Sequence, residues 1–292
     1  ATNSDVYANQ DTVLSSNWGW NAAYTFSATP NVTLLAYNSS PTIPVVMGES
    51  DYEGENILSF AGGATGAYRL RAEEWGTLTW GGIGGYLYGA NSTWTSSWCC
   101  TGSNLNTAGA LQIANINTLM AAVGSWWNLV PDQTHAVVTA GYGSVPGNNV
   151  DPAVANYCTT SANSTTLLTY CPKNTTLTVA MTNFTGLVTA RWYDPSNGTF
   201  TAISGSPFTN TGSHNFVMPG NNADGNPDWL LLLQAAAGAA SLSGHLTYAD
   251  TVAPGKNVLM ALTAPSFTTQ TTTSDVSGNY TFAGLPVGND YT

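Results

Sequence analysis

The chain has 292 residues, enough for two domains of ordinary size, and charged residues make up only 7% of it. Five Lys and Arg against sixteen Asp and Glu give a formal net charge of −11. A field of this sign repels nucleic-acid phosphates, so we expect no nucleic-acid partner. Uncharged Thr, Ser, Asn, Trp and Tyr supply most of the polarity, which favours a secreted protein and contacts with carbohydrate.

Short apolar runs alternate with longer periodic segments in residues 1–130, a pattern typical of β-α units. The run Ile43 to Met47 is apolar on both faces, as expected of a covered parallel strand. We predict three successive β-α units from these segments: a strand through Val13 and Leu14 towards Trp18, a helix around Val32 to Ala36, the strand Ile43 to Met47, a helix from Ala67 that Gly81-Gly82 ends, a strand Ile83 to Tyr88 and an amphipathic helix Leu111 to Trp127.

The pattern changes after a connection at residues 131–149. Residues 150–234 carry short strands separated by Gly, Asn and Pro turns, which predicts an antiparallel β-sandwich. The expected strands are Val154–Thr159, Thr166–Cys171, Leu177–Met181, Val188–Tyr193, Asn215–Met218 and Trp229–Leu233, with a hairpin at Asn197-Gly198. A linker at 235–241 then leads to 242–292, which we interpret as the start of a further β-module.

Acidic residues are concentrated directly after the predicted strand Ile43 to Met47. Glu49, Asp51, Glu53 and Glu55 place four of the sixteen carboxylates within seven residues. In a β/α barrel the carboxyl ends of the strands face the active site, so Glu49 is the first candidate for a catalytic carboxylate. A solvated acidic loop or a cation site is the alternative.

Polar and aromatic groups follow the next predicted strand. Tyr88, Asn91 and Trp94 would lie beside the acidic loop if the sheet is parallel, and they would suit a sugar site. Packing is the alternative role for Trp94. Arg71 would pair with Glu53 or Glu49 near the substrate, or else with Glu73 or Glu74 on a helix surface.

Four cysteines occur, without the spacing of a zinc site. Cys158 and Cys171 flank a polar turn between strand-like runs, where a cross-strand disulfide is geometrically feasible, and a disulfide would fit an oxidising compartment. Cys99-Cys100 would be either a vicinal disulfide or two thiols. We expect no cofactor and no metal. We also expect no membrane span, because no apolar run reaches about 18 residues.

Several motifs occur together in one order. They are Gly48-Glu49 with Tyr52-Glu53-Gly54, Arg71 with Trp75, Tyr88 to Asn91 with Trp94, Pro131-Asp132, Arg191 to Pro195 and Asp228 to Leu231. In this order they resemble the apiosidase-like glycoside hydrolases of family 140, also called domain of unknown function 4038. The later motifs are similar to the β-sandwich that follows that catalytic domain and is described as a collagen-binding domain of a collagenase.

This resemblance implies the C-terminal part of a (β/α)8 barrel, with Glu49 as a catalytic carboxylate at the end of the seventh strand. The partner acid would lie upstream of Ala1, so we expect a fragment that is inactive alone. The expected activity of the whole protein is hydrolysis of glycosidic bonds in plant-type or other polysaccharide side chains, with substrate contacts from Tyr88, Asn91, Trp94, Glu53 and Arg71.

Residues 242–292 are similar to transthyretin-like or carboxypeptidase-regulatory-like modules, which are common as spacers on secreted proteins, and we expect attachment to a cell surface through a further C-terminal region. The resemblance to the glycoside hydrolase family favours a bacterial protein. The rival hypothesis is a surface adhesion or carbohydrate-binding protein that has lost catalysis. Collagen binding, taken from the description of the sandwich, is a third.

Overall fold

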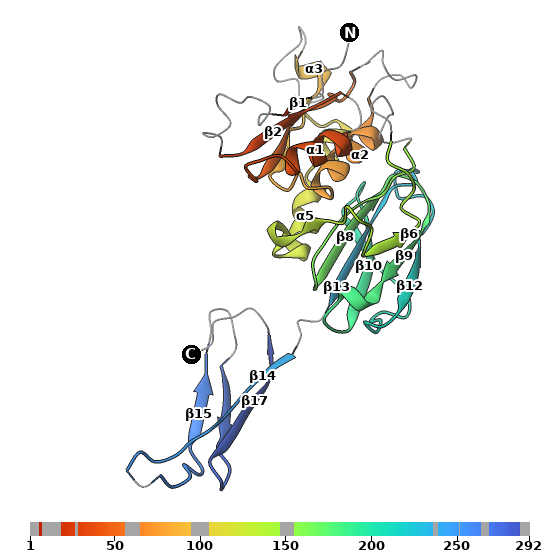
Figure 1. Ribbon diagram of the computed structural model, residues 1–292. Helices are drawn as coiled ribbons and strands as arrows, with labels where there is room; N and C mark the ends of the chain where they lie inside the picture. Colours follow the sequence, from red (N-terminus) through yellow and green to blue (C-terminus); the bar gives the residue numbers. More distant parts are fainter. Residues whose placement is uncertain are drawn as a thin grey trace.

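The computed structural model describes residues 6–7, 19–26, 29–55, 65–94, 105–146, 155–235, 239–250, 252–263 and 269–286. It contains an α/β part, a β-sandwich and a slender C-terminal β-module in chain order (Figure 1). The strand predicted through Val13 and Leu14 towards Trp18 lies outside the described residues, as do Trp98, Cys99 and Cys100.

The α/β part is built on a four-stranded sheet of order β1-β2-β3-β4. β2 and β3 are parallel, β3 and β4 are parallel, and β1 is antiparallel to β2. One helix connects each successive pair of parallel strands, so the described residues contain two β-α-β crossovers. The elements are β1 (Val6–Tyr7), β2 (Asn21–Tyr24), α1 (Thr29–Tyr37), β3 (Val45–Glu49), α2 (Ala67–Leu78) and β4 (Gly85–Tyr86).

Apolar contacts between α1 and the sheet explain this arrangement. Val32 and Ala36 of α1 pack against Ala23, Val45 and Met47, and all five are nearly inaccessible. The predicted helix at Val32 to Ala36 therefore lies within α1, and the strand at Ile43 to Met47 corresponds to β3. The predicted strand Ile83 to Tyr88 is shorter than expected, because ladder pairing is limited to Gly85 and Tyr86.

The single helix predicted from Leu111 to Trp127 is wrong. The structure forms α3 (Asn91–Trp94) and then three short helices, α4 (Ala108–Gln112), α5 (Asn115–Val123) and η3 (Trp126–Asn128). Thr107 caps α4 by accepting a hydrogen bond from the Ala110 amide. Gly124, at φ 74°, ends α5 in a backbone conformation that favours glycine.

The sandwich consists of a six-stranded sheet of order β11-β10-β13-β8-β7-β5 and a three-stranded sheet of order β12-β9-β6. All pairs are antiparallel. The strands are β5 (Val130–Pro131), β6 (Val138–Ala140), β7 (Thr159–Ala162), β8 (Thr166–Cys171), β9 (Thr176–Ala180), β10 (Val188–Asp194), β11 (Thr199–Ala202), β12 (Ser213–Val217) and β13 (Trp229–Ala235), with η4 at Met181–Asn183.

Differences from the predicted sandwich are local. β7 begins at Thr159, where the predicted strand Val154 to Thr159 ends. The hairpin expected at Asn197-Gly198 joins β10 to β11, with Gly198 at φ 76°. β5 and β6 both add to the sandwich sheets, although β5 lies at the boundary between the predicted barrel segment and the connection, and β6 lies within the connection.

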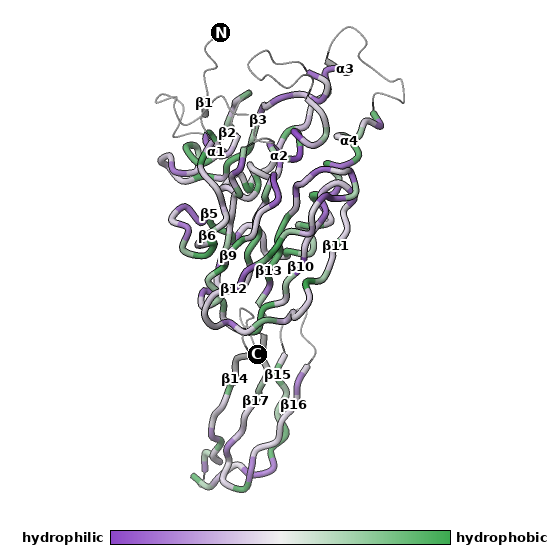
Figure 2. Tube along the Cα trace, turned by 90° about the vertical axis from the view of Figure 1, so that its right-hand side faces the viewer, coloured by the Kyte–Doolittle hydropathy of each residue, from purple (hydrophilic) through white to green (hydrophobic). Residues whose placement is uncertain are grey.

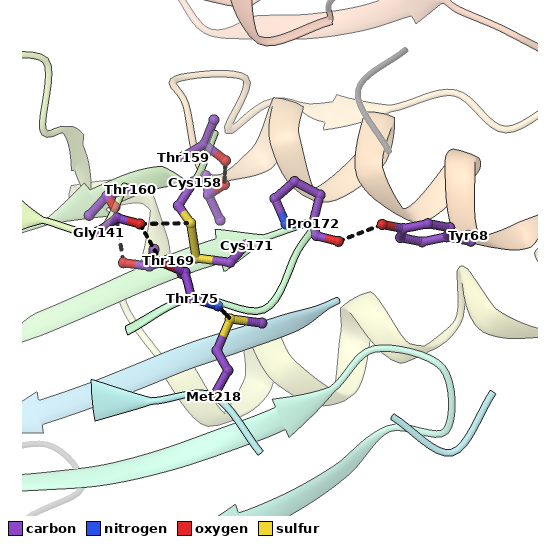
Figure 3. The surroundings of a disulfide bond; sticks show 11 residues. Tyr68, Gly141, Cys158, Thr159, Thr160, Thr169, Cys171, Pro172, Thr175 and Met218 are labelled. Carbon is purple, nitrogen blue, oxygen red and sulfur yellow. Dashed lines mark hydrogen bonds between the residues drawn. A yellow bond between two sulfur atoms is a disulfide. The ribbon is translucent and has the colours of Figure 1, made fainter. Parts of the chain in front are cut away.

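A disulfide joins Cys158 and Cys171, whose Cα atoms are 4.3 Å apart. The β7–β8 register pairs Thr159 with Tyr170, which puts the two cysteines opposite each other at the end of the ladder. Figure 3 shows the bridge beside Pro172, whose carbonyl oxygen accepts a 2.5 Å hydrogen bond from the Tyr68 hydroxyl of α2. The disulfide therefore stabilises the part of the sandwich that contacts the α/β part.

The six-stranded sheet is covered on both faces. Leu231 and Leu233 of β13 point into the core between the two sandwich sheets, whereas Leu230 and Leu232 pack against α2 and α5. Side chains alternate between the faces of a strand, so a continuous run of leucines is what double coverage requires. Figure 2 shows this hydrophobic stretch in β13 at the centre of the sandwich. The α/β part and the sandwich share a core.

A buried ion pair crosses the same boundary. Arg71 of α2 donates to Asp228, from Nε over 2.8 Å and from Nη2 over 2.9 Å, and both side chains are at most 2% exposed. Asn222 also donates to Asp228, over 2.7 Å. Since two buried charges are stable together only when both are hydrogen-bonded, this pair fixes α2 to the loop that precedes β13.

The C-terminal module consists of two antiparallel pairs, β14 with β17 and β15 with β16. Its small core joins Leu262 to Phe282. A turn at Ser277-Gly278 precedes β17, with Gly278 at φ 82°. The strands are β14 (Ala239–His245), β15 (Leu259–Leu262), β16 (Gln270–Thr273) and β17 (Asn279–Pro286).

We predict that Asp228→Ala lowers the free energy of unfolding by about 3 to 5 kcal/mol, because it leaves the Arg71 charge buried without its main partner. Asp224→Ala is the matched control. Asp224 binds the same guanidinium over 3.2 Å, but its side chain is 42% exposed, so its loss costs less than about 1 kcal/mol. Denaturant unfolding measures both, and equal losses would contradict the assignment.

Candidate functional site

Glu49 is the last residue of β3 rather than the first residue beyond the strand, and its register partner in β2 is Tyr24. Its side chain is half-buried. Oε1 accepts a 2.6 Å hydrogen bond from the Tyr52 hydroxyl. The carboxylate therefore lies at the carboxyl edge of the parallel strands with a fixed donor beside it.

Tyr52 reaches Glu49 because Gly89 leaves room for its ring. A Cβ atom at position 89 would overlap the Tyr52 ring. Burial, and then the hydrogen bond to Glu49, raise the pKa of Tyr52 to about 12. At neutral pH the phenol is protonated, so it remains a hydrogen-bond donor to Glu49.

Glu53 is bound at both carboxylate oxygens. Oε2 accepts 2.6 Å hydrogen bonds from the Tyr88 and Thr107 hydroxyls, and Oε1 accepts a 3.0 Å bond from the Gly109 amide. A Cβ atom at Gly109 would lie 2.6 Å from Glu53 Oε2, so only glycine permits this approach. Burial, followed by the bond to Glu53, raises the pKa of Tyr88 to about 12. Glu53 thus links the exits of β3 and β4 to α4.

Asn91 and Trp94 form the two ends of α3, immediately after the exit of β4. The backbone N–H of Asn91 donates to the Glu53 carbonyl oxygen over 2.8 Å, and Glu53 and Ala90 form an isolated parallel β-bridge. The acidic loop and the Tyr88-to-Asn91 segment are therefore side by side. The side chain of Trp94 lies outside the described residues.

Arg71 lies elsewhere. Instead of Glu49, Glu53 or a glutamate on the surface of α2, its guanidinium binds Asp228, with Asp224 and Gln112 as further partners. The prediction that Arg71 contacts substrate is corrected on this point, because the side chain is 2% exposed and engaged between α2 and the sandwich. Long-range pairing of this kind left no signal in the local sequence.

A second buried charge cluster lies beneath the acidic loop. Arg69 binds Asp51 and, through Nε over 3.2 Å, Glu73. The Tyr86 hydroxyl donates to Glu73 over 3.1 Å and contacts Ser50 Oγ at 2.6 Å. Arg69 and Glu73 stand four residues apart, a spacing that indicates a helical ion pair, but the sequence did not show that the whole turn is buried.

One guanidinium serves two buried carboxylates in this cluster, Asp51 and Glu73. Burial raises the pKa of Glu73 to about 8, and the attraction of Arg69 opposes that shift. Glu74, whose Oε1 atom has no hydrogen-bond partner among the described residues, also has its pKa raised by burial. The carboxyl groups of Glu73 and Glu74 are therefore buried groups whose protonated form is favoured.

The carboxylates of the acidic loop have protein donors as partners. Glu55 accepts from the Tyr52 amide over 3.1 Å, Glu49 from the Tyr52 hydroxyl, and Asp51 from Arg69. Within the described residues no group of three or more His, Cys, Asp or Glu side chains is arranged to hold a metal ion. The loop is a hydrogen-bonded assembly in which, among the residues that the structure describes, the Tyr52 phenol donates to Glu49.

A cavity of about 560 Å³ lies apart from this assembly, between α5 and the start of β4. Trp126, Trp127 and Met120 line it together with Gly84 and Gly85, and none of the described residues that line it has a titratable side chain. It lies at the amino-terminal side of β4, opposite the exit that leads to Tyr88.

None of the described helices is long and apolar enough to cross a membrane. No curated protein matches the sequence.

Residues 145–234 match a family model described as "Putative collagen-binding domain of a collagenase". That segment contains β7 to β13 of the sandwich.

Two solved structures have a similar fold. One, titled "Glycoside hydrolase", has a TM-score of 0.63 at 17% identity and covers 79% of this chain and 56% of its own. The other is a glycoside hydrolase family 5 protein from Bacteroides vulgatus, with a TM-score of 0.62 at 16% identity, covering 79% of this chain and 54% of its own. The chain thus spans little more than half the length of these proteins, and the likeness concerns the fold.

We predict that the stability of the protein falls as the pH rises from about 4.5 to about 8. A carboxyl group whose pKa is raised in the folded state favours folding while it is protonated, and this contribution is lost as it ionises. Glu73→Gln removes the ionisation and should flatten this part of the profile, by at most about 1.4 kcal/mol per pKa unit. Thermal unfolding measured at several pH values tests this, and a profile unchanged in the variant would contradict it.

Proposed function

We propose that the chain is part of a glycoside hydrolase and that Glu49 is its catalytic nucleophile. The observation that carries the proposal is the position of Glu49, at the carboxyl edge of three parallel strands with Tyr52 donating to it over 2.6 Å. The catalytic groups of β/α barrels lie at this edge. The described sheet ends at β1 and β4, and in this proposal it forms one side of a (β/α)8 barrel.

In the proposed reaction a Glu49 oxygen forms a bond to the anomeric carbon while the glycosidic bond breaks. A second carboxylic acid, contributed from outside the described residues, protonates the departing oxygen, and water then releases the sugar from Glu49. The Tyr52 hydroxyl orients the free carboxylate before attack. Retention of configuration requires the two carboxyl groups to be about 5 to 5.5 Å apart.

The proposed substrate is a polysaccharide side chain of the kind cleaved by apiosidase-like enzymes. Tyr88 and Asn91 lie at the exit of the neighbouring strand, where a phenol and an amide can contact sugar hydroxyls. Glu53 holds Tyr88 in place and serves the sugar site indirectly. Carbohydrate as the ligand also agrees with glycoside hydrolases being the structural neighbours.

We place the protein outside the cytoplasm. The Cys158–Cys171 disulfide is the kind of bond that persists in oxidising compartments, and only 7% of the residues are charged. The C-terminal β-module then acts as a spacer towards a cell surface. A surface protein that binds carbohydrate without cleaving it is the rival, and hydrolysis assays separate the two.

We predict that Glu49→Gln in the full-length protein lowers kcat at least about a thousandfold, because an amide does not attack the anomeric carbon. Glu55→Gln, in the same loop, is the matched control and should retain turnover. Release of sugar from aryl glycosides and pectic oligosaccharides gives the rates. Normal turnover of Glu49→Gln would overturn the proposal, and sugar binding without any hydrolysis by the unmodified protein would favour the rival.

A further inference from the structure

Gln112, the last residue of α4, contacts two charged groups of opposite sign. Its Oε1 accepts a 2.5 Å hydrogen bond from Arg71 Nη1, and its Nε2 donates to Asp224 Oδ2 over 3.2 Å. Arg71 belongs to α2 and Asp224 to the sandwich loop before β13. The carboxyl end of α4 is therefore bound to both the α/β part and the sandwich.

The sandwich loop is a rigid attachment point. Asn222 Oδ1 accepts from the amides of Asp224 and Asn226, each over 3.0 Å, and Asn222 Nδ2 donates to the buried Asp228. Asp228 in turn holds two nitrogens of Arg71. The partners of Gln112 are thus fixed by Asn222 and Asp228, which are not residues of α4.

The opposite end of α4 holds Glu53. Thr107 and Gly109 donate to the two oxygens of that carboxylate. A helix of five residues is only about 7 Å long and too short to be stable by itself, so the contacts at its two ends decide where it lies. Gln112 at one end and the groups that bind Glu53 at the other are therefore only one short helix apart.

We propose that Gln112 is a positioning residue for the glycosidic reaction: by fastening α4 to the sandwich, it sets the position of Glu53 and Tyr88 beside Glu49. This rests on the proposed function of Glu49. The side-chain amide suits the role, because it presents an acceptor to the guanidinium and a donor to the carboxylate at once. A carboxylate at 112 would repel Asp224, and an ammonium group would repel Arg71.

The test compares three variants of the full-length protein. Gln112→Glu should lower kcat about tenfold or more, with KM within about twofold, because misplaced groups weaken transition-state contacts first. In the double variant, Gln112→Glu with Asp224→Asn, the new carboxylate at 112 accepts hydrogen bonds and the new amide at 224 donates one to it. This variant should recover kcat to within about threefold of the unmodified protein. Gln234→Glu is the control, since Gln234 joins the sandwich to the Ala122 carbonyl of α5 and not to α4.

Hydrogen exchange at the Gly109 amide gives a readout independent of catalysis. It should be faster in Gln112→Glu and return to the original rate in the double variant, with Gln234→Glu unchanged. Normal kcat and exchange in Gln112→Glu, while Glu49→Gln is inactive, would overturn the role of Gln112 and leave the proposed function intact. Loss of kcat that the double variant does not recover would also overturn it, since it would indicate general destabilisation.

If Glu49→Gln retains normal turnover, the proposed function fails, and with it the catalytic consequence assigned to Gln112. The exchange rates then show separately whether Gln112 fastens α4. The two failures are thereby distinguished.

Discussion

Coverage of the six-stranded sandwich sheet on both faces is the constraint on which the rest of the molecule depends. Leu230 and Leu232 complete the core of α2 and α5, while Leu231 and Leu233 complete the core of the sandwich. The α/β part therefore owes much of its buried surface to a strand more than a hundred residues away in the sequence. Burial of these leucines does not by itself fix how the two parts are oriented. The hydrogen-bonded Arg71–Asp228 ion pair adds a contact that depends on direction.

The candidate site is organised by hydrogen bonds from phenols and from a helix end to carboxylates. Tyr52 holds Glu49, while Tyr88, Thr107 and Gly109 hold Glu53. Burial keeps both phenols protonated, so these bonds persist across the physiological pH range. Within the described part of the chain the Tyr52 phenol is the donor to Glu49, whereas Glu53 is bound at both of its carboxylate oxygens.

Local pattern was sufficient to predict the elements whose core positions lie within one segment. The buried run at Val45 to Met47, the helix from Ala67 and the strand Thr166–Cys171 all have such patterns. Local sequence pattern does not predict contacts between segments that are far apart in the chain. The partner of Arg71 stands 157 residues away, and nothing near Arg71 distinguishes a buried helix from an exposed one. Within Leu111 to Trp127, α5 ends at Gly124, where the glycine C-cap outweighs hydrophobic periodicity.

The family match begins at residue 145, yet β5 and β6, which complete both sandwich sheets, precede that point. An exchange between genes at residue 145 would therefore transfer a sandwich without two edge strands to a host without the α2 and α5 surface that Leu230 and Leu232 cover. We therefore expect the α/β part and the sandwich to occur together in related proteins. The C-terminal β14–β17 module, in contrast, can be replaced or absent.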